Sequence, residues 1–249
     1  MQDETTLNGD FLVNNEWKRR NPEESAYLVA TPQTIEEVEC SVQEDSVYGS
    51  NANGFELKHY LGLHPTNTVR DEVIHKILLI DYTNSTNLKI YKKKKTTVFL
   101  LADQIVAHSQ DLDRMIQEGN PEAVRLLAGF GTVNLFSFAT KYCCYHNAIC
   151  YGRDDYSIYD SIVAKAIPHY LTINRFYISK CREKRDYLEY KRIIDTLITV
   201  HDLQGIPHIR RKMDHFLWFP NRQQQVDRTK TLLEKDASRP RGTHPRASV

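Results

Sequence analysis

Two short stretches of the sequence each place one charged residue among apolar and aromatic neighbours. SFATKYCCYH, at residues 137–146, carries Lys141, and SIYDS, at residues 157–161, carries Asp160. A lysine amine in apolar surroundings is easier to keep neutral, and a neutral amine is a nucleophile that can form a Schiff base. A carboxylate can stabilise a developing positive charge or help to move a proton. The two residues are therefore the candidates for chemistry.

Each of the two residues also has a purely structural interpretation. On a helix, Lys141 lies near the edge of the apolar face that includes Phe138 and Tyr142, so its stem could cover the core while its amine stays in water. Asp160 precedes SIVAKAI, at residues 161–167, and an acid at a helix start is a common cap. The catalytic interpretation requires the two side chains to lie close together in the folded chain, whereas the structural interpretation does not.

The sequence contains five cysteines, and three of them, Cys143, Cys144 and Cys150, lie close to His146. Zinc and iron–sulfur sites typically use CxxC pairs or four suitably spaced cysteines, and the sequence contains neither pattern. A zinc site built from these thiols and His146 is the alternative to reduced, mostly buried cysteines, which we prefer. We expect no metal and no cofactor.

The composition is that of a globular protein, with 41% hydrophobic and 26% charged residues among 249. No apolar run approaches the length of a bilayer span, and the first residues, MQDETTLNGD, are polar and acidic rather than a secretory signal. These features predict an intracellular, cytoplasmic protein without a membrane partner. Nothing in the sequence indicates an obligate protein partner.

The net charge of +1 conceals an asymmetry between the two halves of the chain. Residues 1–129 contain 13 Lys+Arg and 20 Asp+Glu, a net charge of −7. Residues 130–249 contain 20 Lys+Arg and 12 Asp+Glu, a net charge of +8. A basic C-terminal half is typical of proteins that bind polyanions such as nucleic acid. A solvated basic surface is the alternative.

Apolar residues recur at helical spacing along the chain, and no stretch alternates with a period of two, so we predict an all-α fold. One helix is expected to start at Thr34, with a capping box completed by Glu37. The other predicted helices are at about 68–82, 98–109, 111–118, 120–128, 132–146, 158–167, 183–203, 206–218 and 221–235. We expect an irregular N-terminal arm over 1–30, a helical domain over 31–236 whose two lobes meet near residue 130, and a disordered basic tail over 237–249.

Several segments resemble base-excision DNA glycosylases of the helix–hairpin–helix superfamily. LLIDYTNSTNLK at 78–89, SFATKYCCYHN at 137–147 and SIYDSIV at 157–163 are similar to a bacterial group of 8-oxoguanine DNA glycosylase-like proteins. Gly129-Phe130-Gly131 resembles the superfamily's hairpin turn. The resemblance covers about residues 68–218 and implies a two-lobed, multi-helix DNA-glycosylase-like fold.

The resemblance also implies roles for particular residues. Lys141 matches the lysine that attacks the sugar C1′ in bifunctional glycosylases, and Asp160 matches the catalytic aspartate, nineteen positions later. The residues that it implies for contact with a flipped base are Phe138, Tyr142, Tyr145, His146, Tyr159 and Ser161. Those that it implies for contact with the DNA backbone are Gly129, Gly131, Thr132 and Asn134. Core packing is the alternative for the aromatic side chains.

The leading hypothesis is a DNA N-glycosylase, with or without β-lyase activity, that excises a damaged or modified purine such as 8-oxoguanine from duplex DNA. A second hypothesis keeps the carboxylate chemistry for an N-glycosidase that acts on a free nucleoside or nucleotide. A third is a non-catalytic, helical nucleic-acid-binding or defence protein on the same scaffold.

Overall fold

The structure is a computed structural model that describes residues 17–22, 27–45, 53–84, 97–130 and 133–222. The predicted helix at 221–235 beyond Arg222 and the tail at 237–249 lie outside the described residues, as does most of the N-terminal arm. Over the described ranges every regular element is a helix, and the only bridge pairs Arg19 with Leu171. The all-α prediction is therefore confirmed. The helices are α1 Pro32–Glu44, α2 Asn53–Leu63, α3 Arg70–Asn84, α4 Val98–Ala107, α5 Ser109–Glu118, α6 Glu122–Ala128, α7 Phe136–Tyr151, α8 Ser161–Ala166, η4 Ile167–His169, α9 Arg175–Lys184, α10 Tyr187–Val200 and α11 Ile209–Trp218.

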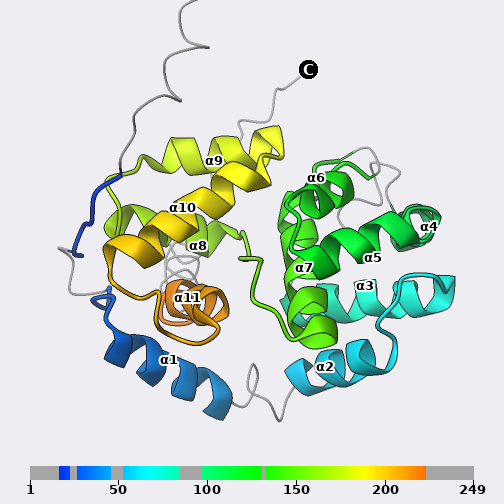
Figure 1. Cartoon of the computed structure of the whole chain (residues 1–249), viewed down its shortest axis with the longest axis horizontal. Coiled ribbons are helices and arrows are strands. Elements are labelled where there is room, and N and C mark those ends of the chain that lie inside the picture. The colour runs from blue at the N-terminus through cyan, green and yellow to red at the C-terminus, as the bar shows by residue number, and fades with distance from the viewer. Residues whose placement is uncertain (1–16, 23–26, 46–52, 85–96, 131–132, 223–249) are drawn as a thin grey trace, which may run out of the picture.

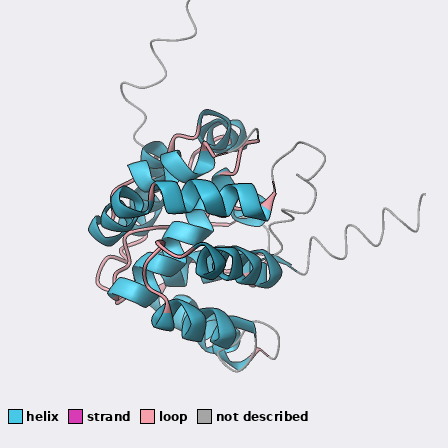
Figure 2. Cartoon of the chain, turned by 90° about the vertical axis from the view of Figure 1, so that its right-hand side faces the viewer, coloured by secondary structure: helices cyan, strands magenta, loops and turns pink. Residues whose placement is uncertain are grey.

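The helices pack in two groups, which lie side by side in Figure 1 and are seen from the side in Figure 2. Helices α2 to α7 form one group, and α1 packs with α8 to α11 in the other. The chain passes between the groups over residues 152–160, which we call the connector. The sequence analysis predicted two lobes that meet near residue 130. Helix α7 begins after residue 130 and packs against α2, α3, α5 and α6, which come before it.

Helix α7 is buried along most of its length, on several faces at once. A helix that is apolar all round is typical of the interior, because every face contacts another element. Its buried residues are Phe136, Phe138, Ala139, Thr140, Lys141, Tyr142, Cys143, Cys144, His146 and Asn147. One of the two candidate catalytic residues is therefore held in the core.

Two local predictions are corrected by the structure. The cap of α1 is Thr31, whose hydroxyl accepts from Thr34 N at 3.2 Å while Thr31 N donates to Thr34 Oγ1 at 3.0 Å. Helix α1 thus starts three residues earlier than predicted, and Pro32 suits its first position. The predicted helix at 183–203 is instead the end of α9 and the whole of α10, because Arg185 adopts the left-handed region with φ 57°.

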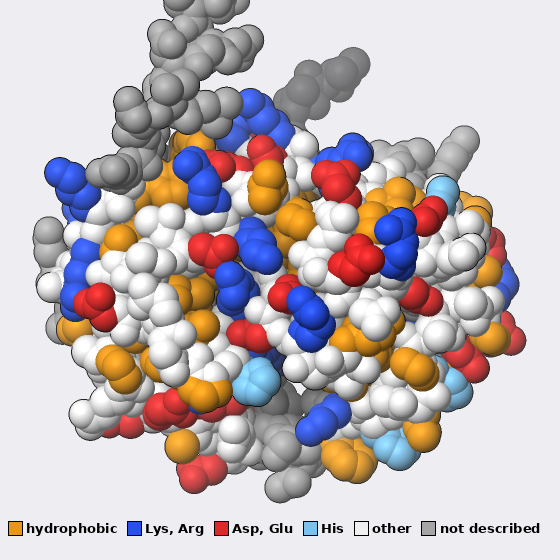
Figure 3. All heavy atoms as spheres, viewed as in Figure 1, with side chains coloured by type: hydrophobic (Ala, Val, Ile, Leu, Met, Phe, Trp, Pro, Cys, Tyr) orange, Lys and Arg blue, Asp and Glu red, His pale blue; other side chains and the backbone are white. Residues whose placement is uncertain are grey.

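The face of the molecule shown in Figure 3 carries Lys and Arg side chains interspersed with Asp and Glu. Within the described chain, no helix is both long and apolar enough to cross a membrane.

Two glycines after helix ends give a matched pair for a stability test. Gly119 and Gly152 both have positive φ, 72° and 63°. A Cβ at Gly119 would lie 2.5 Å from Asp155 Cγ, whereas a Cβ at Gly152 would meet nothing within 4 Å. Gly152→Ala should therefore cost only the left-handed strain of about 1–2 kcal/mol. Gly119→Ala should cost about 1–3 kcal/mol more, because the contact must also be relieved. Urea unfolding of both variants measures the difference, and equal losses would contradict the contact with Asp155.

Candidate functional site

The backbone of the connector is held by side chains from helices of both groups. Ser157 N donates to Tyr187 Oη at 2.7 Å, and Ile158 N donates to Asp214 Oδ2 at 2.9 Å. Tyr190 Oη donates to the Ile158 carbonyl at 2.7 Å. A buried segment outside regular structure has to satisfy its polar backbone groups in this way. The connector is consequently fixed in place immediately before Asp160.

Asp160 is the cap of helix α8. Its Oδ1 accepts from Ile162 N at 2.8 Å and from Val163 N at 2.9 Å, as its sequence position suggested. One residue earlier, Tyr159 N donates to Thr140 Oγ1 at 3.1 Å, which ties the end of the connector to α7. The cap and this bond fix Asp160 at the start of α8, directly after a residue that is bonded to α7.

Lys141 is almost completely buried, with 5% of its surface exposed. Its Nζ donates to Ser137 Oγ, one helical turn earlier, at 3.5 Å. Burial lowers the pKa of Lys141, and the charges of Asp160, Asp81 and Asp214, in that order, oppose the shift. The suggestion that its amine stays in water at the edge of a helix face is therefore wrong.

The charge of Asp160 thus acts on the pKa of Lys141. Among the carboxylates that act on the Lys141 amine, Asp160 has the largest influence. Asp160 is half-buried, and its Oδ1 is committed to the α8 cap. The structure combines a desolvated amine, easier to deprotonate than an ordinary lysine, with a carboxylate whose position is set by a helix start. Such a pair can form a Schiff base and stabilise a cation beside it.

Three of the side chains predicted to contact a base lie inside the core. Phe138, Tyr142 and His146 are at most 2% exposed. Tyr142 Oη donates to Asn67 Oδ1 at 2.6 Å, and the His146 ring stacks on Tyr142 with 4.2 Å between centroids. Burial lowers the pKa of His146 to about 3, so this ring is neutral near pH 7. In this conformation the three side chains pack against protein.

The other three predicted contacts are Tyr145 in α7, Tyr159 in the connector and Ser161 at the start of α8. Tyr145 is half-buried beneath the guanidinium of Arg211, which lies 4.8 Å from the ring centroid. Tyr159 is 4% exposed and packs edge-on against Phe136 at 5.3 Å, whereas Ser161 is exposed. A role for these six side chains in binding a base stays a prediction.

Of the four residues predicted to contact the DNA backbone, the described residues include Gly129 and Asn134. Gly129 follows α6 with helical backbone angles. Asn134 Oδ1 accepts from Phe136 N at 3.0 Å, and its Nδ2 donates to the Arg182 carbonyl at 2.6 Å, so the side chain joins the start of α7 to α9. Gly131 and Thr132 lie outside the described residues.

Asp214 was not predicted as a site residue, yet it is 3% exposed and accepts a hydrogen bond from the connector backbone. Burial raises its pKa well above the usual value, against the opposing effects of the Ile158 N–H and the Arg211 charge. The available signal was its place in α11 beside Met213 and two residues before Phe216, both of which are buried apolar positions. An acid on the buried face of a helix needs a partner, and here the partner is the connector backbone.

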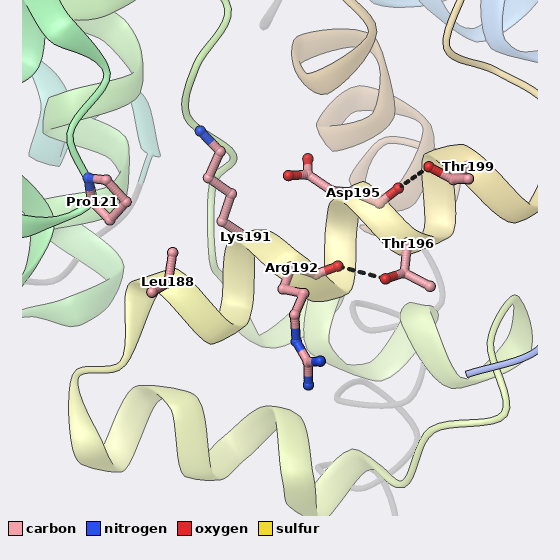
Figure 4. Close-up of a pocket in the computed structure, with 7 residues that line it drawn as sticks. All are labelled: Pro121, Leu188, Lys191, Arg192, Asp195, Thr196 and Thr199. Atoms are coloured by element: carbon pink, nitrogen blue, oxygen red, sulfur yellow. Dashed lines mark hydrogen bonds between the residues drawn. The ribbon is translucent and has the colours of Figure 1, made fainter. Parts of the chain in front are cut away.

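Surface depressions lined by the described residues include two that contain neither Lys141 nor Asp160. The larger, of about 580 Å³, lies against α10 and is lined in part by Lys191 and Arg192 (Figure 4). Thr196 and Thr199, which also line it, donate their hydroxyls to backbone carbonyls within α10. The smaller, of about 280 Å³, lies between α1 and residues 219–222. Both depressions are separate from the Lys141–Asp160 pair.

The cysteines of the described chain are free thiols, with Cys143 and Cys144 buried. Burial raises the pKa of Cys144 to about 12, so its thiol is a poor metal ligand at neutral pH. No group of three or more His, Cys, Asp or Glu side chains suited to a metal ion occurs among the described residues.

Comparison with known proteins finds a match to the family HI_0787_N, described as an N-terminal domain, over residues 34–154. This stretch contains Lys141 and ends within the connector, before Asp160. A protein of Haemophilus influenzae strain Rd, described as uncharacterized, is 28% identical over 156 residues, which are 61% of this chain and 72% of that protein. No solved structure matches the chain. The chain is thus similar to this domain family over most of α1, the group of α2 to α7 and the start of the connector.

Proposed function

We propose that the chain is a DNA N-glycosylase with lyase chemistry, in which Lys141 is the nucleophile and Asp160 its carboxylate partner. One observation carries the proposal. The amine of Lys141 is desolvated in the core, and Asp160, at the start of α8, is the carboxylate that acts on it most strongly. A lysine that only served solubility would keep its amine in water.

The proposed reaction replaces the base by the lysine at the sugar. Neutral Lys141 Nζ attacks C1′, the bond from C1′ to the base nitrogen breaks, and the base leaves with the bonding electrons and takes up a proton. The Asp160 carboxylate stabilises the positive charge that develops on the sugar. Loss of a proton from the amine and opening of the sugar ring then yield a Schiff base at C1′. Because Lys141 is 5% exposed, side chains around it must separate when a flipped nucleotide enters.

Trapping with borohydride tests the proposal directly. A duplex that contains 8-oxoguanine is incubated with the folded chain and borohydride, which reduces a Schiff base to a stable adduct. We expect one adduct, mapped by peptide mass spectrometry to Lys141 and absent in Lys141→Ala. The lowered pKa of Lys141 should allow trapping at neutral pH, where an ordinary lysine is almost fully protonated.

Lys76 provides an internal control for the trapping experiment. It is also fully buried, and burial lowers its pKa to about 8, but its Nζ donates to the Thr66 carbonyl at 2.5 Å and to Asn67 Oδ1 at 3.1 Å. It should stay unmodified. An adduct on Lys76, or a folded wild type that neither traps nor releases any modified base from duplex DNA, would refute the proposal. Base release from a free modified nucleoside but not from a duplex would favour the nucleosidase hypothesis.

A further inference from the structure

Helix α9 and its cap form the most uneven run of charge in the described chain near the candidate site. Residues 175–185 contain five basic side chains and one acidic side chain. The acid, Glu183, is paired with Lys180 at 2.7 Å. The remaining four, Arg175, Arg182, Lys184 and Arg185, have no ion pair with any described residue.

Two of these cations lie beside named segments of the chain, Arg182 beside Tyr159 and Arg185 beside Gly129. Arg175 and Arg182 are seven residues apart, so they lie on one face of α9. The charge of Arg182 opposes the rise that burial causes in the pKa of Tyr159, the residue before Asp160. Arg185 Nη1 lies 3.5 Å from the position that a Cβ on Gly129 would occupy. Arg182 therefore lies beside the end of the connector, and Arg185 lies beside the turn after α6.

Three exposed arginines elsewhere in the described chain are paired with carboxylates. Arg70 pairs with Asp103 at 2.5 Å, Arg114 with Asp111 at 3.2 Å and Arg125 with Glu122 at 2.5 Å, as ordinary surface arginines do. Arg175 and Arg182 are likewise exposed, but without such partners among the described residues. Helix α9 lies along the outer edge of its group in Figure 1, and Lys and Arg side chains are visible along this edge in Figure 3.

We propose that Arg175, Arg182 and Arg185 form the surface that binds the phosphate backbone of duplex DNA, which we call the α9 arginine surface. The inference rests on the proposed function for its choice of polyanion. A guanidinium binds a phosphate through two parallel hydrogen bonds, and its charge is not lost at any physiological pH. The surface would hold the duplex beside the connector end, so that a flipped nucleotide is delivered towards Asp160 and Lys141.

The test compares two triple variants that remove equal charge. One is R175Q/R182Q/R185Q, and the control is R70Q/R114Q/R125Q, which removes three arginines that are already paired. Binding of a fluorescent, unmodified duplex is measured by anisotropy between about 50 and 200 mM salt. The first variant should bind at least tenfold more weakly at the lowest salt, and its plot of log K against log salt should be shallower by about 2.7, for three lost phosphate contacts. The control should change affinity less than threefold.

Equal weakening of both variants would show a general charge effect and overturn the proposal, as would no weakening in either. Loss of binding to anionic lipid vesicles, with DNA binding intact, would also overturn it. If trapping fails while DNA binding still depends on the α9 arginines, only the proposed chemistry is refuted. If trapping succeeds and R175Q/R182Q/R185Q binds DNA like the wild type, only the α9 arginine surface is refuted.

Discussion

Asp160→Asn is expected to slow base excision by about 10²–10⁴-fold, the range typical of losing one catalytic acid–base group. Asparagine is as good a helix cap as aspartate, so its Oδ1 can still accept from Ile162 N and Val163 N. The variant therefore removes the charge of Asp160 and keeps α8. Single-turnover release of 8-oxoguanine from a duplex measures the rate, and urea unfolding checks that stability is unchanged.

The same variant should also change the pH dependence of trapping. The Asp160 charge raises the pKa of Lys141 against the lowering effect of burial. Without that charge the pKa of Lys141 falls further, so the neutral amine predominates from a lower pH. The pH profile of adduct formation should shift to lower pH in Asp160→Asn, even though less adduct forms.

Asp160→Ala provides the matched comparison, since it removes both charge and cap. It should be as slow as Asp160→Asn and should lose about 1 kcal/mol of stability in addition. If Asp160→Asn keeps the wild-type rate and an unshifted pH profile while Asp160→Ala is destabilised, Asp160 serves only as a cap and the catalytic assignment fails.

Local patterns allowed the helices and the cap at Asp160 to be predicted, because both depend on neighbouring residues. SIVAKAI after Asp160 places the acid at a helix start, and the structure has α8 at Ser161–Ala166. The break between α9 and α10 was missed because it depends on the left-handed backbone of Arg185, a residue with no special preference for that conformation. Helix α2 was missed as well, since Gly54 and Gly62 weaken its helical pattern.

The burial of Lys141 could not be predicted, because it depends on helices far away in the sequence. Periodicity shows which side of one helix is apolar, and Lys141 lies at the edge of that side. Since α2, α3, α5 and α6 all pack against α7, the edge is buried too. The hydrogen bonds that hold the connector could not be predicted for the same reason. Tyr187, Tyr190 and Asp214 bind backbone groups 30 to 56 positions earlier, and no local pattern encodes such pairs.

Asp214→Ala is expected to destabilise the chain by about 2–3 kcal/mol, because Ile158 N would be left buried without an acceptor. The rate of base excision should fall as well, since the connector positions Asp160. Asp214→Asn keeps an oxygen for the Ile158 N–H and should lose much less stability. Unfolding in urea at neutral pH distinguishes the two variants, and the ratio of their excision rates tests the link to Asp160.

The pH dependence of these stabilities tests whether Asp214 is neutral in the folded chain. Its pKa is raised by burial, so the folded chain holds this proton more tightly than the unfolded chain. The stability that it contributes is therefore complete below the unfolded pKa of about 4 and is lost as the pH rises towards the folded value. Asparagine does not titrate, so the stability of Asp214→Asn relative to wild type should increase from pH 4 upwards. A decrease over this range would instead show that Asp214 is ionised against Arg211, and that the connector is held by a buried charge pair.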